Sequence, residues 1–464
     1  MERPSDDVAS AVVEEASALV ADADVALASP ALGLASSVLR RASDFPKACE
    51  KAKALVVPAA LSLASSPLMQ KPALVALRGF FAALTRANLA GADFETTLAS
   101  LMDRSSLGGR LLADGGGGSS SAAMSAAGTL SGSGVAEIGK AVAECVAATC
   151  AAAGADASRR TTSKLVASLE KGGSLKAGKG GKAPKTDADA SERLLALLCL
   201  GELGRAAAAT DAASEEDALE RVLLAALDAS GEDLKSAASF ALGGVAAGNR
   251  ARFLPTILAK MDEMPTHRYS LLCSLGEVIR AGEPEDDDDD DGGGDGDASS
   301  AAKTAQLSDA ELDHILDVLF KNAGSDEEGV RNVTAECLGR LAARRPTRLL
   351  PELTSRLDPA LHPDASTRVT AVTAVKHLAR AVAKRKDAVL SALVAPCLAS
   401  CVVGPNAALS DEDVGVRRVL SHTGSHTTAF AWWTPILKDF FRRVACLSAH
   451  PSLLSIPALG AFQR

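Results

Sequence analysis

Aromatic residues are scarce in this chain of 464 residues. They make up 3% of the sequence, with one Tyr and two Trp, although hydrophobic residues make up 47%. Strands are enriched in aromatic and β-branched residues, whereas most of the apolar residues here are Ala, Leu and Val. Ala and Leu are strong helix formers. The composition therefore argues against a β-sandwich or barrel and predicts an all-α protein.

The chain also lacks an excess of positive charge and a long apolar run. Its net charge is −9, with both signs spread along the sequence, whereas nucleic-acid binding needs a basic face. The longest apolar run, near "LLALLCLGELG", is too short to span a bilayer, and the start "MERPSDDVAS" has no signal-peptide core. We expect no nucleic-acid partner, no membrane association, and a soluble protein of the cytoplasm, the nucleus or both.

Motifs for metal binding and catalysis are missing. The nine Cys form no CxxC pair, and none has a His at zinc-finger spacing, which favours reduced, buried thiols. GxSxG and HExxH are absent, and His267, His314 and His377 occur singly in helical segments. The sequence therefore predicts no catalytic, cofactor-binding or metal site, no small-molecule substrate and no enzyme activity.

Two segments resemble ligand-binding loops only in part. "GSLKAGKG" from Gly173 approaches a P-loop, but Gly180 stands where a hydroxyl is needed and no apolar strand precedes it. An ATP-using enzyme built around Lys179 is the least favoured interpretation. The acidic run at Asp287 starts like a calcium loop, but Ala298 stands where a bidentate Glu is needed. A flexible basic loop and a solvated acidic run are preferred.

An amphipathic helix is predicted in "DEEGVRNVTAECLGRLAARRPTRLLPEL", which starts at Asp326. Acidic residues precede the helix, where they favour its N-terminus. The apolar pattern ends before Pro346, and a second helix is predicted near "LLPEL", with Pro351 in its first turn. The residues that share one face of the first helix are Val330, Val333, Thr334, Cys337, Leu338 and Leu341.

The pattern of a basic residue followed eight positions later by Gly recurs along the chain. From Arg193 onward, successive copies lie 33–42 residues apart, except where the acidic run intervenes, and this period is typical of HEAT or armadillo repeats. The sequence therefore predicts an α-solenoid of HEAT/armadillo-type helix pairs. The pairs are Lys71/Gly79, Arg193/Gly201, Lys235/Gly243, Arg268/Gly276 and Arg331/Gly339, with a degenerate copy at Arg368/Lys376.

These ten residues of the full copies are interpreted as stacking residues rather than ligand contacts. Each basic residue is expected to pair with acids before its own helix or in the next repeat. Each Gly is expected at the flank of the apolar face, where a neighbouring helix approaches closely. Both features suit repeats that bury their cores only against their neighbours.

Low-complexity segments divide the array. Helical repeats are predicted in residues 1–113, 135–170, 191–282 and 305–419. Disorder is expected in the Gly/Ser-rich linker 114–134, the basic loop 171–190 and the acidic insert 283–304. The tail 420–464 breaks the repeat and holds both Trp. We interpret this tail as an inserted or mis-spliced stretch. The alternative is that Trp432 and Trp433 form an exposed aromatic anchor for a binding partner.

Several of these repeats carry a family resemblance. "LLALLCLGELGR", "DLKSAASFALGGVAAGNRARFLPTIL", "RYSLLCSLGEVI", "EEGVRNVTAECLGRLAARRPTRLLPEL" and "STRVTAVTAVKHLA" resemble successive HEAT repeats in the C-terminal half of the cullin-associated, neddylation-dissociated regulators. The resemblance covers about 191–419 and, more weakly, 50–90, where "SSPLMQKPALVALRGFFAAL" is similar to preceding repeats. Family members are far longer, so the resemblance implies an internal to C-terminal part of such a chain.

The resemblance implies a non-catalytic function. Members of that family wrap around an unneddylated cullin–RING ubiquitin ligase, and their C-terminal half covers the adaptor-binding end of the cullin. Cullin binding and control of adaptor and substrate-receptor exchange are therefore expected, with contacts at Glu327, Glu328, Asn332 and Arg368. Nothing here matches the family's β-hairpin or its repeats for the RING end, so cullin contact is better supported than exchange. The alternative is a transport receptor or a phosphatase-type scaffold, because an acidic loop suits basic cargo.

Overall fold

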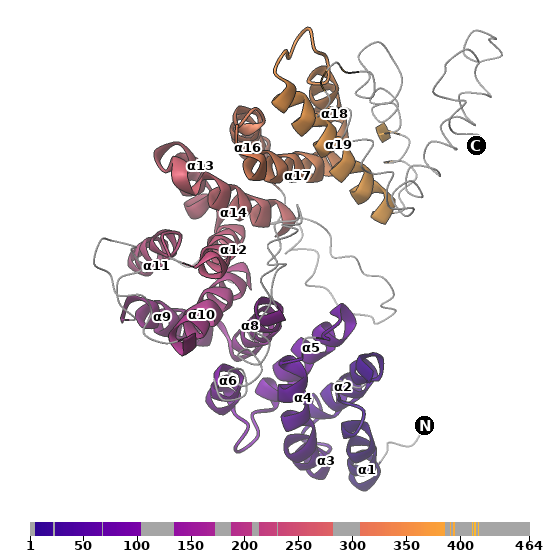
Figure 1. Ribbon diagram of the computed structural model, residues 1–464. Helices are drawn as coiled ribbons and strands as arrows, with labels where there is room; N and C mark the ends of the chain where they lie inside the picture. The colour runs from indigo at the N-terminus through magenta and orange to yellow at the C-terminus, as the bar shows by residue number, and fades with distance from the viewer. Residues whose placement is uncertain are drawn as a thin grey trace, which may run out of the picture. The chain divides into compact units, whose positions relative to one another are not determined.

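The computed structural model describes residues 5–21, 24–66, 68–103, 134–171, 187–206, 213–229, 231–281 and 307–385, together with 390, 393–394, 411, 413 and 416. In these residues every regular element is a helix (Figure 1). The chain divides into two compact units. The first unit holds the described helices up to residue 281, and the second holds those from residue 308 onward.

The first unit begins with α1 (Asp6–Ser17), α2 (Val25–Leu39), α3 (Pro46–Lys51), the π-helical turn η2 (Ala52–Val56), α4 (Val57–Ala64), α5 (Lys71–Ala87) and α6 (Phe94–Met102). It continues with α8 (Gly134–Ala153), α9 (Ala155–Lys171), α10 (Asp187–Ala206), α11 (Ala213–Ala226), α12 (Glu232–Gly248), α13 (Arg250–Glu263), the short 3₁₀ helix η3 (Pro265–His267) and α14 (Arg268–Ala281).

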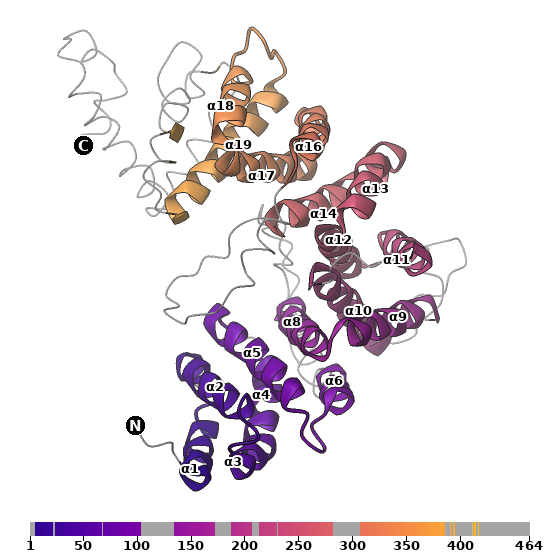
Figure 2. The same ribbon diagram turned by 180° about the vertical axis from the view of Figure 1, so that it is seen from behind.

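Six helices of the first unit form a stacked row. In the order α2, α5, α8, α10, α12 and α14, each packs against the next (Figures 1 and 2). Flanking helices lie against the members of this row: α1 and α3 on α2, α6 on α8, α9 on α8 and α10, α11 on α12, and α13 on α12 and α14. Pairs of one row helix and one flanking helix, repeated along the chain, are the arrangement of a HEAT-type solenoid.

The second unit repeats this arrangement with α16 (Asp309–Asn322), α17 (Glu328–Arg344), α18 (Pro346–Ser355) and α19 (Ala365–Arg385). Helices α17 and α19 pack against each other as row helices, while α16 and α18 flank them (Figure 2). The predicted fold class, an all-α solenoid of helix pairs, is therefore confirmed.

Local signals in the sequence start the helices. At the start of α16, Ser308 Oγ accepts a hydrogen bond from Glu311 N at 3.2 Å, and the Glu311 carboxylate accepts one from Ser308 N at 2.7 Å. This capping box satisfies amide groups that have no partner inside the helix. Asp93 caps α6 in a similar way, through its contact with Thr96 N at 2.9 Å.

Glycines bring neighbouring row helices into backbone contact. A Cβ atom added to Gly201 would lie 3.0 Å from Ala241 Cα, one on Gly243 would lie 2.6 Å from Ser274 O, and one on Gly339 would lie 2.6 Å from Ala374 O. No other residue fits at these three positions without movement of the facing helix. Gly276 is buried in α14.

Gly79 does not follow this pattern. No atom lies within 4 Å of the position that a Cβ would take there. In the described residues no neighbouring helix approaches Gly79 closely, so the prediction is wrong at this position. Helix α5 packs against its neighbours through its large apolar side chains instead. Leu77, Phe80, Phe81 and Leu84 are all fully buried.

Exposed ion pairs join successive flanking helices. Such pairs contribute at most about 1 kcal/mol each, because solvent screens them. The pairs are Lys164–Glu95 between α9 and α6 at 3.5 Å, Arg221–Glu170 between α11 and α9 at 3.9 Å, Arg252–Asp217 between α13 and α11 at 2.9 Å, and Arg348–Asp313 between α18 and α16.

The start of α18 differs from the prediction. The helix begins at Pro346, and Pro351 lies inside it rather than in its first turn. A Pro in the first turn removes an amide that would have no helical partner, so Pro346 is the better start. The helix continues past Pro351 because Leu349 and Leu353 on either side of it are buried.

The expected boundaries of the inserts also differ from the structure by a few residues, since α8 begins at Gly134, the last residue of the expected linker 114–134. Helix α10 begins at Asp187, so the last four residues of the expected basic loop 171–190 are helical. The acidic residues in "DADASER" favour the start of a helix. Lys171 is the last residue of α9. Residues 172–186 of that loop with Lys179, linker residues 114–133, the acidic insert 283–304 and the tail 420–464 with both Trp lie outside the described residues. No helix among the described residues has the length and apolar character needed to cross a membrane.

The glycine contacts lead to a test of stability. Gly243→Ala should lower the free energy of unfolding by about 1–3 kcal/mol, because the new Cβ would overlap Glu277 Cβ and Ser274 O on α14. Gly79→Ala should raise it by roughly 0.5–1 kcal/mol, because Ala favours the helix and has free space. Urea unfolding followed by circular dichroism measures both. Equal changes in the two variants would contradict the packing described.

Candidate partner interface

Arg331 lies in the first turn of α17 and folds back over the residues that lead into the helix. Its Nη1 donates hydrogen bonds to the carbonyl oxygens of Ser325 at 2.6 Å and Asp326 at 2.9 Å. The pairing with a carboxylate that the sequence predicts is therefore wrong for Arg331 in the described residues. Main-chain carbonyls take its place because the side chain turns back along its own chain.

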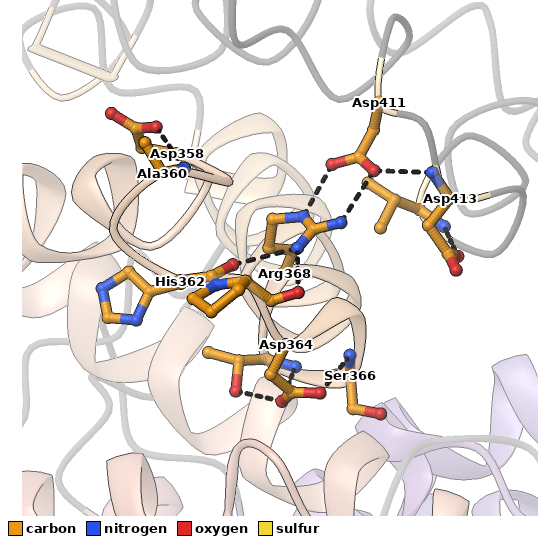
Figure 3. A network of polar contacts seen from close by, with 11 residues as sticks. Asp358, Ala360, His362, Asp364, Ser366, Arg368, Asp411 and Asp413 are labelled. Atoms are coloured by element: carbon orange, nitrogen blue, oxygen red, sulfur yellow. Dashed lines mark hydrogen bonds and ion pairs between the residues drawn. The ribbon is translucent and has the colours of Figure 1, made fainter.

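Arg368 makes the same contacts at the start of α19 and one more (Figure 3). Its Nη1 donates to the carbonyl oxygens of His362 at 2.9 Å and Pro363 at 2.8 Å. Its Nε and Nη2 bind the two carboxylate oxygens of Asp411 at 2.7 and 2.9 Å. A bidentate pair of this kind is among the strongest side-chain hydrogen bonds. It ties the start of α19 to a residue 43 positions further along the chain.

Burial removes Arg368 from the predicted contact residues. The side chains of Arg368 and Asp411 are only 6% and 4% exposed, and Arg368 is engaged in four hydrogen bonds. The prediction that Arg368 meets a partner is therefore wrong, because the side chain points into the turn between repeats. Glu327 and Glu328 are exposed at the start of α17 and Asn332 is half-buried, so these three stay predicted contacts.

The other predicted stacking cations lie on separate helices of the first unit. Lys71 is the exposed first residue of α5, and Arg268 is the half-buried first residue of α14. Arg193 is half-buried in α10. Lys235 pairs with Glu232, three residues before it, at 2.8 Å, which is the pairing with a preceding acid that the sequence suggests.

A charged network that was not predicted joins α10, α12 and α14. The buried Glu277 carboxylate accepts hydrogen bonds from Arg205 at 3.0 Å and from Arg280. The Arg205 guanidinium also lies 5.4 Å from the centre of the Phe240 ring. Two cations offset the cost of burying one carboxylate. The repeated pattern G-E-x-x-R, at 201–205 and 276–280, is the sequence signal that could have revealed this network.

Glu144 extends the network to α8 and α5. Its carboxylate lies 3.6 Å from the guanidinium of Arg78 on α5. Burial raises the pKa of Glu144, and the negative charge of Glu202 raises it further, while Lys140, Arg78 and Arg205 oppose the change. In the first unit, charges of both signs are therefore brought together between the row helices.

In the second unit a basic cluster occupies the row, defined here as Arg340 on α17 with Lys376, His377 and Arg380 on α19. Four charged groups act on His377: the three cations of this cluster and the carboxylate of Glu336. Glu336 is buried and lies 3.0 Å from Arg340. Burial lowers the pKa of Lys376, and the charge of Arg380 adds to the effect. Arg380 is exposed. The cluster is thus net positive and suits the acidic surface of a partner.

His377 is held neutral inside this cluster. Burial lowers its pKa from 6.5 to about 4; Glu336 acts in the opposite direction, whereas Arg380, Lys376 and Arg340 lower the pKa further. A neutral imidazole leaves the positive charge of the cluster to the Arg and Lys side chains.

Comparison with known proteins finds relatives that are much longer than this chain. No protein-family model matches it. It is 32% identical over 382 residues to Cullin-associated NEDD8-dissociated protein 1 of Arabidopsis thaliana, covering 82% of this chain and 26% of that protein. It is 32% identical over 226 residues to Cullin-associated NEDD8-dissociated protein 2 of Mus musculus, covering 49% of this chain and 15% of that protein. The chain therefore spans about a quarter or less of the length of these curated relatives.

Comparison with solved structures finds only distant similarity. A crystal structure of importin beta overlaps 94% of this chain and 54% of its own, with 12% identity and a TM-score of 0.35. A score this low carries no argument about function. The sequence relatives are therefore the useful guide, and the resemblance stated from the repeats is confirmed.

The buried pair at the start of α19 leads to a stability test. Arg368→Met alone should cost about 3–5 kcal/mol of unfolding free energy, because it leaves the Asp411 carboxylate buried without its partner. The double variant Arg368→Met/Asp411→Leu should recover most of this loss. Arg348→Met, which breaks the exposed pair with Asp313, is the matched control and should cost less than about 1 kcal/mol. Similar costs for the buried and exposed pairs would refute the role given to Arg368.

His377 predicts a dependence of stability on pH. Its pKa in the folded chain, about 4, lies below the ordinary value of 6.5, so the unfolded chain binds this proton first as pH falls. Stability should therefore be lost between about pH 6.5 and 4, by roughly 3 kcal/mol at most. His377→Gln should flatten this part of the profile, measured by urea unfolding at each pH. The exposed His314→Gln should leave it unchanged; identical profiles for wild type and His377→Gln would contradict the account.

Proposed function

Since the chain belongs to the cullin-associated NEDD8-dissociated family, we propose that it binds cullin–RING ubiquitin ligases as a non-catalytic regulator. The observation that carries this proposal is the 32% identity to the Arabidopsis relative, which extends over 82% of this chain. Similarity over such a length includes the repeated helix pairs of both units.

The architecture supports binding along an extended surface. Stacked repeats present a long array of side chains to one partner. In the second unit, exposed Glu327 and Glu328 lie at the start of α17, and the basic cluster lies further along α17 and α19. We propose that these two charged regions contact the cullin, because complementary charge sets specificity and the rate of association.

The regulatory part of the proposal is more specific. We propose that the chain binds only the cullin that carries no NEDD8, and that it thereby controls the exchange of adaptors and substrate receptors. The support is the resemblance of residues 191–419 to repeats that cover the adaptor-binding end of the cullin. An exchange activity requires that the chain and an adaptor compete for the same end.

A pull-down with purified cullin–RING complex, unmodified and neddylated, tests the proposal. The chain should retain the unmodified complex and release the neddylated one. Arg380→Glu should weaken binding to the unmodified complex by about tenfold or more, because it reverses an exposed charge of the basic cluster.

The control is Arg86→Glu, an equal charge reversal at an exposed position of α5 in the first unit. It should leave binding unchanged. Equal weakening by both variants would mean that overall charge, and not the basic cluster, sets the affinity. Failure to retain either complex would overturn the proposal and favour the transport or phosphatase-type scaffold.

A further inference from the structure

Ser325 lies in the turn that joins α16 to α17 and is followed by three acidic residues. Helix α16 ends at Asn322 and α17 begins at Glu328, so Ser325 lies outside both helices. Ser325 is half-buried, whereas Asp326, Glu327 and Glu328 are exposed. A serine followed directly by exposed carboxylates is the substrate pattern of acid-directed serine/threonine kinases, which select their substrates by charge.

The hydroxyl group of Ser325 is free to react. Its Oγ accepts a hydrogen bond from Glu327 N at 3.3 Å, and within the described part of the chain it donates to no acceptor. No neighbouring group therefore holds the hydroxyl proton, and a kinase can remove it during phosphoryl transfer.

Ser308, before α16, has a similar sequence but a different structure. It is also followed by acidic residues at the first and third positions, and it is more exposed than Ser325. Its Oγ, however, donates to the Glu311 carboxylate at 2.8 Å and accepts from Glu311 N at 3.2 Å. This capping box occupies both the hydroxyl group and a carboxylate that a kinase would recognise. The structure therefore distinguishes two serines that the sequence presents alike.

Arg331 is placed to bind a phosphate on Ser325. Its Nη1 lies 2.6 Å from the carbonyl oxygen of Ser325 itself, and its Nε is buried without a hydrogen-bond partner in the described residues. At the start of α19 the corresponding Arg368 makes the same main-chain contacts and also binds the Asp411 carboxylate. Within the described residues, the turn before α17 therefore has the cation of this arrangement without the anion.

The start of α17 adds a second favourable feature. The residue before the helix, Glu327, makes no capping hydrogen bond with its side chain, so the first amide groups of α17 remain available to an anion. The three carboxylates next to Ser325 would repel a phosphate group. Its binding would therefore depend on the guanidinium of Arg331, which can offset this repulsion.

We propose that Ser325 is a phosphorylation site for an acid-directed serine/threonine kinase, and that Arg331 binds the phosphate. In the reaction Ser325 Oγ attacks the γ-phosphorus of Mg·ATP while the kinase takes the hydroxyl proton. The Oγ–P bond forms as the bond from that phosphorus to the β-phosphate oxygen breaks, and ADP leaves. The modification adds a charge of about −1.5 to −2 at pH 7 to the exposed acidic region before α17. The inference concerns the free chain and does not depend on the cullin proposal.

Treatment of the full chain with casein kinase II, an acid-directed kinase, and Mg·ATP tests the site. Tryptic peptide 322–331 has Ser325 as its only hydroxyl side chain, and tryptic peptide 304–321 carries Ser308. Mass spectrometry should find one phosphate on peptide 322–331, formed at least about tenfold faster than any phosphate on peptide 304–321.

Paired variants test whether the acidic residues direct the kinase. Asp326→Asn/Glu328→Gln should slow the phosphorylation of Ser325 by about tenfold or more, because it removes the carboxylates that the kinase recognises. Asp309→Asn/Glu311→Gln makes the same change in the first turn of α16. This control should leave the rate at Ser325 unchanged.

Three outcomes would overturn the site. The first is phosphorylation of a synthetic peptide of residues 322–331 but not of the folded chain, which would mean that the fold shields Ser325. The second is faster phosphorylation of Ser308 than of Ser325. The third is no phosphate on either the synthetic peptide or the chain, which would mean that the kinase does not recognise this sequence.

Phosphorus NMR of the phosphorylated chain tests the contact with Arg331. A bound guanidinium favours the dianion and lowers the second pKa of the phosphate, which is about 6 in phosphoserine. Arg331→Gln should raise this pKa by about half a unit or more. Arg344→Gln, which removes a cation in the last turn of α17, should leave it unchanged. Equal pKa values in the wild type and Arg331→Gln would overturn the proposed contact.

Discussion

Backbone contact between successive row helices is the constraint on which both units depend. At Gly201, Gly243 and Gly339 the next helix lies so close that a single Cβ would displace it. This proximity lets small side chains such as Ala form a buried core with few aromatic residues. The ion pairs between flanking helices are exposed and individually weak, so the row, and not the flanks, determines how the repeats stack.

The same constraint decides where charge can lie. Inside the row a carboxylate is tolerated only where cations surround it, as Arg205 and Arg280 surround Glu277. At the turns, Arg368 binds Asp411 in a buried pair that links one repeat to the following chain segment. In the basic cluster of the second unit, Arg380 is exposed and so remains available to a partner.

The sequence predicted what is periodic and local. Helix pairs, their spacing and the glycines that face a neighbour could be read from a pattern that repeats within each unit. It did not predict the burial of Arg368, because its partner lies 43 residues further along the chain. Nor did it predict the basic cluster, whose members come from two helices and are brought together only by stacking. Gly79 carried the repeat pattern without a close neighbour, since large side chains set the spacing there.

The central claim is that the charged edge of the second unit meets the cullin. Hydrogen exchange of the chain, measured by mass spectrometry alone and with unmodified cullin–RING complex, tests it most directly. The account predicts slower exchange in peptides that cover α17 and α19 when the complex is present, with little change in α9 and α11. Protection confined to the first unit, or none at saturating complex, would contradict the claim.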